Sequence, residues 1–313
     1  MKVLVTGGTG YLGRASVAAF QARGHALVIF ARSATRSGLP GTLVDGDVRD
    51  RTALERAAAG CDAIAHAAAL VSIWRRRSAD FDDVNVGGLR NVLSVAAALK
   101  IPRVLYTSSF VAIAPRGRST PLEANDYQRT KVAADRLADG AVAEGSPLIR
   151  VYPGVVYGPG SFTEGNLVGR LIADHLRGRL PGLVGPEHPW SYAYVRDVAA
   201  GHCAALERGR IGGRYMLGGE NASQRRVFEI VQQVTGRRPP PRIPFPVASA
   251  LGAAEELRVR MFGGTPLITR GAVEIFRHDW SLDSSASVRE LGYTMTPLAG
   301  GLNTTIASIR DAR

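Results

Sequence analysis

The chain has 313 residues, of which 45% are hydrophobic, and a formal net charge of +12, enough for one large α/β domain or two smaller ones. It contains no run of about 18 apolar residues, so we expect no membrane span. The two cysteines, Cys61 and Cys203, are too few for a disulfide framework or a zinc site, and we expect no metal. A strand that begins at residue 2 leaves no room for a signal peptide, so we expect a cytoplasmic protein.

The positive charge comes almost entirely from arginine, because Lys2, Lys100 and Lys131 are the only lysines. A basic surface can attract nucleic acid or anionic lipid. The longest basic run is the three arginines at 75–77, and no nucleic-acid-binding motif accompanies it. We therefore expect no nucleic-acid partner, although an anionic cofactor would account for only a few of the charges.

The chain opens with a predicted strand over 2–5, a glycine-rich turn over Thr6–Gly13 and a helix over 14–21. Its glycines have the spacing Gly-x-x-Gly-x-x-Gly, and they are Gly7, Gly10 and Gly13. In that order they permit a tight turn, close approach of the backbone to a pyrophosphate, and close packing of helix on strand. The free N–H groups at the start of the helix would then face an anion. The pattern favours a dinucleotide-binding turn over a tight turn without a ligand.

Strands and helices then alternate along the first half of the chain. Short apolar runs predict strands over 26–30, 42–44, 62–66, 103–107 and 148–151. Helices are expected over 52–59, 80–99 and 127–142. The pair Gly87-Gly88 weakens the middle of the second helix. This alternation predicts an α/β protein with a Rossmann-type, doubly wound parallel sheet.

The chain is less regular after residue 160. Expected elements are a helix over 195–207, a strand over 214–217, a helix over 227–235 and a proline-rich connector over 236–246. The rest is expected to be mostly helical, with breaks at 263–264 and at Gly292. We assign 1–160 to a dinucleotide-binding domain, to which the helix and strand near 195–217 return. Residues 161–313 are expected to form mainly a smaller, mostly helical substrate-binding part, which supplies the second wall of a pocket at the carboxyl ends of the strands.

Tyr127 and Lys131 are four residues apart, which places them on one face of the expected helix. A nearby ammonium favours the phenolate and lowers the pKa of a tyrosine. Such a tyrosine can exchange a proton with a carbinol oxygen while a hydride moves. The alternative is an accidental, solvated pair. The position of the pair after the fifth strand of a dinucleotide-type sheet favours the catalytic interpretation.

Hydroxyl residues Thr107, Ser108 and Ser109 end the fifth predicted strand. A hydroxyl at that position would point into the same crevice and could hydrogen-bond a substrate oxygen. The alternative is that the serines only cap the end of the strand. The order of these residues relative to Tyr127 favours the first interpretation.

Several motifs together resemble the extended short-chain dehydrogenase/reductases, the superfamily of the NAD-dependent epimerases and dehydratases, over nearly the whole chain. They are Thr6–Gly13, Asp47-Val48, the stretches 66–69, 85–88 and 106–109, the Tyr127/Lys131 pair, and 152–160. Within this superfamily the chain resembles the dihydroflavonol-reductase-like branch and, in particular, plant farnesol dehydrogenases. Bacterial hopanoid-associated sugar epimerase-like proteins share many of the same stretches.

The resemblance implies a role for each matching residue. Ser109 matches the catalytic hydroxyl, Tyr127 the general acid/base, and Lys131 the lysine that binds the nicotinamide ribose and lowers the tyrosine pKa. Cofactor contacts are implied for Tyr127 and Lys131 and also for Gly7, Thr9, Gly10, Tyr11, Leu12, Gly13, Asp47, Val48, Ala67, Ala69, Asn85, Thr107, Pro153 and Val156. The chain departs from the family in Thr130, where serine is usual, and in a shorter loop between Ser109 and Tyr127.

The residues after the second strand bear on the choice of nicotinamide cofactor. An acid that would hold a ribose 2′-hydroxyl is expected there, but the chain has Phe30-Ala31-Arg32, with Arg36 beyond. An arginine suits a 2′-phosphate, so Arg32 favours NADP over NAD. The alternative is that Arg32 only stacks on the adenine face, which both cofactors permit.

Aromatic and aliphatic residues are the candidates for a substrate wall. Trp74, Phe110, Tyr157 and Tyr192 are the residues that we assign to the substrate, and Ile73, Phe162, Leu167, Trp190 and Tyr194 are further candidates. All could equally belong to the core. Arg170 and Arg177 are the best candidates for binding a sugar-nucleotide diphosphate, and the alternative for them is a solvated helix face. His188 and His202 are interpreted as structural.

These features favour an NAD(P)-dependent oxidoreductase of class EC 1.1.1.- that acts on a small terpenoid, steroid-like or flavonoid-like molecule. A nucleotide-sugar epimerase or dehydratase with tightly bound NAD is the alternative. A non-catalytic cofactor sensor is a third hypothesis, weakened because Ser109, Tyr127 and Lys131 are all present. The resemblance further implies a homodimer formed through two helices, one of which carries Tyr127.

Overall fold

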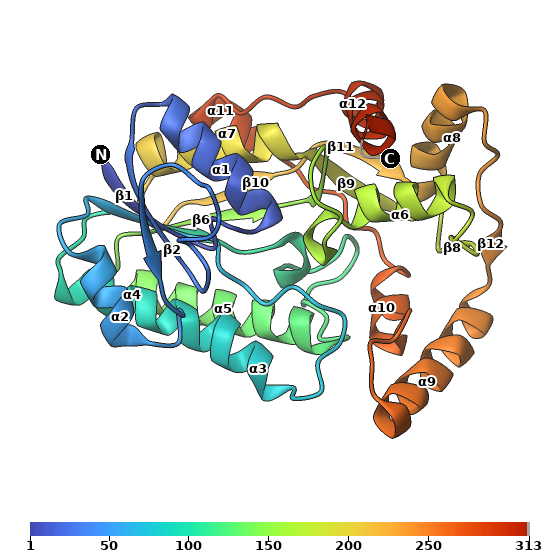
Figure 1. Ribbon diagram of the computed structural model, residues 1–313, viewed down its shortest axis with the longest axis horizontal. Helices are drawn as coiled ribbons and strands as arrows, with labels where there is room; N and C mark the ends of the chain where they lie inside the picture. The colour runs from blue at the N-terminus through green and yellow to red at the C-terminus, as the bar shows by residue number, and fades with distance from the viewer. Residues whose placement is uncertain (312–313) are drawn as a thin grey trace.

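The computed structural model describes residues 1–311 and is organised around a seven-stranded sheet (Figure 1). Its order is β10-β6-β5-β4-β1-β2-β3, and all neighbouring strands are parallel. The bounds are β1 (Lys2–Thr6), β2 (Ala26–Ala31), β3 (Thr42–Asp45), β4 (Ala63–His66), β5 (Val104–Thr107), β6 (Leu148–Pro153) and β10 (Arg214–Leu217). The predicted Rossmann-type sheet is confirmed, and its strand order reverses between β1 and β4, where such folds bind ligands.

Helices cover both faces of this sheet (Figure 1). One face carries α1 (Tyr11–Ala22), α7 (Val195–Arg208) and α11 (Ser285–Leu291), and the other carries α2 (Arg51–Ala58), α4 (Gly88–Ala98) and α5 (Asp126–Ala143). Successive residues of a strand point to opposite faces. Accordingly, Val3 and Val5 of β1 pack in one apolar cluster, whereas Leu4 packs in the other. Burial on both faces explains why these strands are continuously apolar.

The glycine-rich turn joins β1 directly to α1, which begins at Tyr11, three residues earlier than expected. Gly7 has φ +75°, and a Cβ on it would lie 2.5 Å from the backbone nitrogen of Ala68. A Cβ on Gly13 would collide with the carbonyl oxygen of Gly7. The turn can therefore close onto the end of β4 only because these positions carry no side chain.

The helical segment expected over 80–99 is present but changes its pitch. It consists of α3 (Ala79–Phe81), a π-helical stretch η1 (Asp82–Gly87) and α4. Such stretches occur frequently at functional sites. Here the π-helical stretch contains Asn85, whose side chain is buried. The glycine pair that weakened the prediction of a continuous helix therefore lies where the pitch changes.

Five short strands were not predicted. They form a three-stranded sheet of β7 (Val155–Tyr157), β9 (Pro189–Tyr194) and β11 (Glu220–Ser223), and a two-stranded sheet of β8 (Leu183–Val184) and β12 (Arg242–Ile243). Each has at most six residues and pairs with a segment distant in sequence. Local patterns therefore indicate them poorly. Between β6 and β7, Gly154 lies so close to the carbonyl of Ser191 that a Cβ would not fit.

The C-terminal part packs its helices around these small sheets. They are α6 (Leu167–Leu176), α8 (Gln224–Thr235), α9 (Phe245–Phe262), α10 (Arg270–Ile275) and α12 (Leu298–Asp311). The predicted breaks are present, because α9 ends before Gly263 and α11 ends before Gly292. In Figure 1, α9 and α10 project from the rest of the molecule. None of the helices between residues 1 and 311 has the length and apolarity needed to cross a bilayer.

Candidate active site

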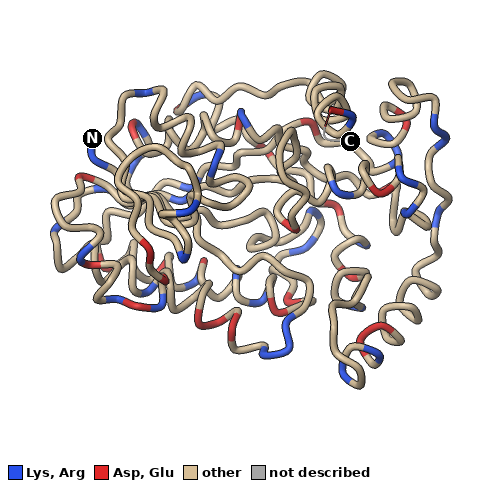
Figure 2. The backbone as a smooth tube through the Cα atoms, viewed as in Figure 1, with Lys and Arg blue, Asp and Glu red and all other residues tan. Residues whose placement is uncertain are grey.

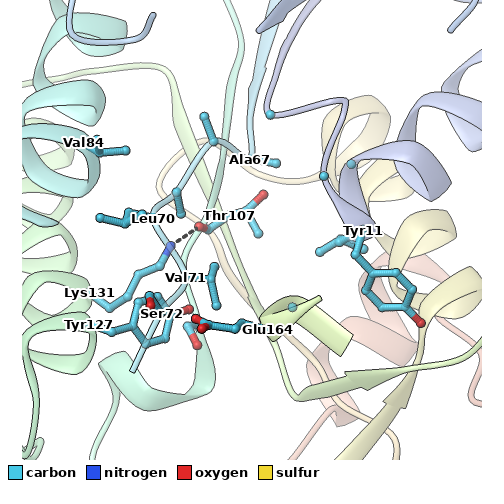
Figure 3. Close-up of a pocket in the computed structure, with 18 of the residues that line it drawn as sticks. Tyr11, Ala67, Leu70, Val71, Ser72, Val84, Thr107, Tyr127, Lys131 and Glu164 are labelled. Carbon is cyan, nitrogen blue, oxygen red and sulfur yellow. Dashed lines mark hydrogen bonds between the residues drawn. The ribbon is translucent and has the colours of Figure 1, made fainter. Parts of the chain in front are cut away.

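A cavity of about 870 Å³ opens at the carboxyl ends of the central strands. The glycine-rich turn and the start of α1 line one side of it, and Ser109, Tyr127 and Lys131 line the other. Figure 3 shows Tyr127 and Lys131 facing this space, with Tyr11 across from them. The sheet and the first turns of two helices thus bring together residues that are more than 100 positions apart.

The start of α5 sets the position of Tyr127. The Asn125 side chain caps this helix by accepting a 2.8 Å hydrogen bond from the backbone N–H of Gln128. Tyr127 therefore lies in the first turn and Lys131 in the next, on the same face. The Lys131 ammonium donates a 3.0 Å hydrogen bond to the carbonyl oxygen of Thr107, at the end of β5 (Figure 3).

Burial shifts the pKa of both side chains. It lowers the pKa of Lys131 to about 8, against an opposing effect of the Asp135 carboxylate. Burial raises the pKa of Tyr127, and hydrogen bonding with Ser109 acts in the opposite direction. The expectation that Lys131 lowers the pKa of Tyr127 is therefore not seen in this structure, because desolvation of the phenol dominates.

Ser109 caps a short helix and also lines the cavity. Its Oγ accepts a 3.4 Å hydrogen bond from the N–H of Val111 and so caps the short helix η2 (Phe110–Ala112). The same residue lines the cavity beside Tyr127. The hydroxyl of the neighbouring Ser108 instead donates to the Asp135 carboxylate at 3.3 Å. Of the two serines, Ser109 is thus the one whose hydroxyl lies beside the tyrosine.

His202, which was interpreted as structural, supports the end of β5. Its Nδ1 lies 2.7 Å from the carbonyl oxygen of Val198, and its Nε2 lies 3.0 Å from Oγ1 of Thr107. Since a carbonyl can only accept, Nδ1 carries the proton and the Thr107 hydroxyl donates to Nε2. Burial lowers the pKa of His202 to about 4, so the ring is neutral and orients Thr107.

The other side of the cavity fits a dinucleotide. The first turn of α1 has no side-chain cap, so its free N–H groups are available to an anion. Gly7 and Gly13 leave no room for a side chain because the turn and the start of α1 pack there against the backbone, which keeps the turn tight beneath the cavity. Nearly all predicted cofactor residues line this cavity, namely Gly7, Thr9, Gly10, Tyr11, Leu12, Gly13, Arg32, Asp47, Val48, Ala67, Ala69, Thr107, Tyr127, Lys131, Pro153 and Val156.

Asn85 is the exception among the predicted cofactor residues, because it does not line the cavity. Its Oδ1 accepts a 2.7 Å hydrogen bond from the N–H of Leu70, and its Nδ2 donates to the Leu70 carbonyl and to Oγ1 of Thr130. Leu70 lines the cavity. Asn85 thus holds a cavity loop against α5 from behind, and Thr130, the departure from serine, takes part in the same contact.

Arg49 lines the cavity and was missed by the sequence reasoning. Its guanidinium donates to both carboxylate oxygens of Asp47, at 3.0 and 2.8 Å, and lowers the pKa of that carboxyl. Arg32 also contributes to this lowering. The signal available in the sequence was the position of Arg49 two residues after Asp47, on the same turn.

The substrate side of the cavity differs in part from the prediction. Phe110, Ile73, Leu167, Trp190 and Arg170 line it, whereas Trp74, Tyr157, Tyr192, Phe162, Tyr194 and Arg177 do not. Tyr157 and Tyr192 are buried in the apolar cluster around the three-stranded sheet. Their side chains pack into that sheet's own core, so substrate contact is not supported for either of them.

A short helix near the C-terminus completes the apolar wall. Ala272, Ile275 and Phe276, from α10 and its end, line the cavity. The Phe276 ring stacks on Trp190 at a centroid distance of 4.9 Å. Sequence patterns indicate this contact poorly, because α10 has only six residues. The prediction that the C-terminal part supplies a second wall thus has a specific basis in α10.

The sheet topology, the glycine-rich turn and the tyrosine–lysine pair define an extended short-chain dehydrogenase/reductase. The model of the NAD dependent epimerase/dehydratase family matches residues 3–218, and the chain belongs to this family. Membership indicates an NAD-dependent enzyme and a nicotinamide cofactor. Among residues 1–311, no group of three His, Cys, Asp or Glu side chains is placed to hold a metal ion.

Three known proteins are similar to the chain over nearly its whole length. Sterol demethylase protein B of Methylococcus capsulatus is 33% identical, with 99% of each chain covered. A putative dihydroflavonol 4-reductase of Synechocystis sp. is 30% identical, with 95% of this chain and 91% of the relative covered. The crystal structure of gox2253 has a TM-score of 0.83 and 29% identity, with 99% and 98% covered.

Proposed function

We propose that this chain is an oxidoreductase that transfers a hydride between a nicotinamide cofactor and the carbonyl or alcohol carbon of an apolar substrate. The observation that carries the proposal is that Ser109, Tyr127 and Lys131 line one cavity that also has an apolar wall. The apolar part of the wall comprises Ile73, Phe110, Leu167, Trp190, Ile275 and Phe276. The names of the similar proteins, sterol demethylase protein B and a putative dihydroflavonol 4-reductase, agree with a terpenoid, steroid-like or flavonoid-like substrate.

The residues divide the chemistry between them. When bound, the nicotinamide supplies or accepts the hydride. In the reducing direction Tyr127 gives its phenolic proton to the carbonyl oxygen of the substrate, and in the oxidising direction it takes that proton back. The Ser109 hydroxyl donates a hydrogen bond to the same oxygen and holds it beside Tyr127. Lys131 supplies positive charge next to the phenol and a donor for the cofactor ribose.

The test is a screen of alcohols and ketones of graded apolar size with both cofactors, followed by the absorbance of reduced nicotinamide. We expect turnover to increase with apolar size, and kcat to fall by about 10²–10⁴-fold in Tyr127→Phe. Tyr215→Phe is the matched control, because Tyr215 is buried and lies outside the cavity lining. A Tyr127→Phe enzyme with wild-type kcat would show that another group transfers the proton.

We further propose that NADP is preferred over NAD. Arg32 lines the cavity just after β2, and Arg49 lies on the same side. Their guanidinium groups suit the 2′-phosphate that distinguishes NADP. In Arg32→Asp we expect KM for NADP to rise by roughly tenfold to 100-fold while KM for NAD changes little. An unchanged KM for NADP would mean that Arg32 only stacks on the adenine.

A nucleotide-sugar epimerase or dehydratase is the second candidate. Arg170 lines the cavity and could pair with a diphosphate, and the family includes epimerases. Such an enzyme regenerates its cofactor and retains it. Tightly bound NAD in the purified protein, with no net change in reduced nicotinamide during turnover, would favour this candidate over the reductase.

The homodimer implied by the family resemblance remains a prediction, and light scattering of the purified protein would measure it.

A further inference from the structure

The projecting helical arm, which we define as residues 245–275, gathers exposed apolar side chains. Of the eleven large apolar residues exposed within residues 1–311, six lie on it. They are Val247, Leu251, Leu257, Met261, Phe262 and Leu267. Phe262 is 78% exposed and Leu267 is 87% exposed. A concentration of exposed apolar side chains marks an interaction site more often than scattered single residues do.

Only one face of α9 is covered by the rest of the chain. Ala248, Gly252 and Val259 are buried on that face, and a Cβ on Gly252 would lie 2.9 Å from the backbone nitrogen of Arg270. Val247 and Leu251, one turn apart, are exposed on an adjacent face. The apolar residues at the end of α9 and in the following loop extend this uncovered surface to the tip of the arm.

Positive charge lies on the connector that leads to the arm. Residues 237–244 contain three arginines and no acidic residue, whereas the arm itself has three arginines and three glutamates. All three glutamates are paired, Glu255 with Arg258 at 2.9 Å, Glu256 with Arg270 at 2.9 Å and Glu274 with Arg277 at 3.3 Å. Arg260 has no carboxylate partner within residues 1–311 and is exposed. Figure 2 shows basic residues near the tip and along the connector that leads to α9.

We propose that the arm docks on the surface of an anionic lipid bilayer. Apolar side chains flanked by arginines are the combination that inserts at the boundary between headgroups and acyl chains. The surface is convex and at the end of a projection (Figure 1), which suits a deformable layer. A second copy fits less well, because an isologous contact would bring together two chains of charge +12, each with three arginines on the connector beside the arm.

The same arm reaches the substrate cavity. Val273 of α10 packs with Ala248 of α9, while Ile275 and Phe276 line the cavity. An arm seated on a bilayer would therefore bring the apolar wall close to molecules dissolved in the lipid. This route for the substrate rests on the proposed function, whereas docking of the arm does not.

The experiment is co-sedimentation of the whole chain with vesicles of phosphatidylglycerol and phosphatidylcholine in equal parts, compared with phosphatidylcholine alone. We expect binding to the anionic vesicles and weaker binding at high salt. Phe262→Ser combined with Leu267→Ser is expected to weaken it by at least about tenfold, because two apolar side chains no longer insert. Ile211→Ser, at a residue 49% exposed outside the arm, is the matched control.

Three results would overturn the proposal. The first is that the wild type does not bind anionic vesicles, and the second is that the double variant binds them as well as the wild type does. The third is that the wild type binds no vesicles but forms a dimer in light scattering, and that the double variant is a monomer. The last would assign the arm to a second copy. Because both side chains are largely exposed, thermal unfolding of the double variant should match the wild type. Dehydrogenase activity is measured separately on a water-soluble substrate, so its absence would count against the proposed function and not against docking.

Discussion

The Lys131 ammonium donates a 3.0 Å hydrogen bond to the carbonyl oxygen of Thr107. This contact ties the second turn of α5 to the carboxyl end of β5. Lys131 is only 4% exposed, and it also lies 5.4 Å from the centre of the Tyr106 ring. A single buried lysine thus joins the helix that carries Tyr127 to the end of the strand that leads to Ser109.

Removal of this ammonium should impair catalysis and cofactor binding together. In Lys131→Met we expect kcat to fall by about 10²-fold or more, and KM for the cofactor to rise, because the phenol and ribose lose a cationic donor. Steady-state kinetics measure both. Lys100→Met is the matched control, since Lys100 is exposed at the end of α4. Equal changes of kcat and KM in the two variants would mean that the loss of one positive charge, and not the position of Lys131, causes them.

The same variant should reveal the cost of burying Lys131. The pKa of Lys131 falls from 10.5 to about 8 in the folded chain. Between those values the unfolded chain binds more protons, so this lysine makes the protein more stable as pH rises from about 8 to 10.5. The gain is on the order of 3 kcal/mol. The Lys131→Met variant should lack this gain in stability. The free energy of unfolding, measured with urea at several pH values, tests this.

The predicted effect of pH on the stability difference has a definite sign. The free energy of unfolding of the wild type minus that of Lys131→Met should increase from pH 8 to pH 10.5 and stay constant below pH 7. Methionine retains the length of the side chain, so the comparison isolates the charge. A difference that does not depend on pH would mean that the ammonium is hydrated in the cavity.

Ser109→Ala should reduce the rate more than the stability. We expect kcat to fall by roughly tenfold to 100-fold, because one donor to the reacting oxygen is lost. The cap to Val111 is long, at 3.4 Å, so the melting temperature should change little. Ser108→Ala tests the neighbouring hydroxyl, which donates to Asp135 and not toward the tyrosine. A larger rate loss in Ser108→Ala would reverse the assignment.

Gly13→Ala should damage the dinucleotide side of the cavity. Its Cβ would collide with the carbonyl of Gly7, so we expect a loss of about 1–3 kcal/mol in stability and weaker cofactor binding. Gly140→Ala is the control, because Gly140 lies within α5 with no atom within 4 Å of the added Cβ. That change should stabilise the helix by about 0.5–1 kcal/mol. Calorimetry and cofactor titration of both variants provide the comparison.

Local sequence patterns predicted the elements that depend on local interactions. The strand, turn and helix at the N-terminus follow from apolar residues beside spaced glycines, and the helix expected over 127–142 agrees with α5 to one residue at each end. The pair Tyr127 and Lys131 faces one way because of helix geometry alone. The short strands β7 and β9 depend on partners far along the chain, so they escaped prediction, and with them the burial of Tyr157 and Tyr192.

The sequence by itself determined the doubly wound sheet, the dinucleotide turn and the identity of the tyrosine–lysine pair, because each follows from spacing within a segment. Tertiary structure decided which residues share the cavity. It added Arg49 and α10, removed Trp74 from the lining, and placed Asn85 behind a loop. It also set the direction of the pKa shift at Tyr127, since desolvation depends on how completely distant segments exclude water.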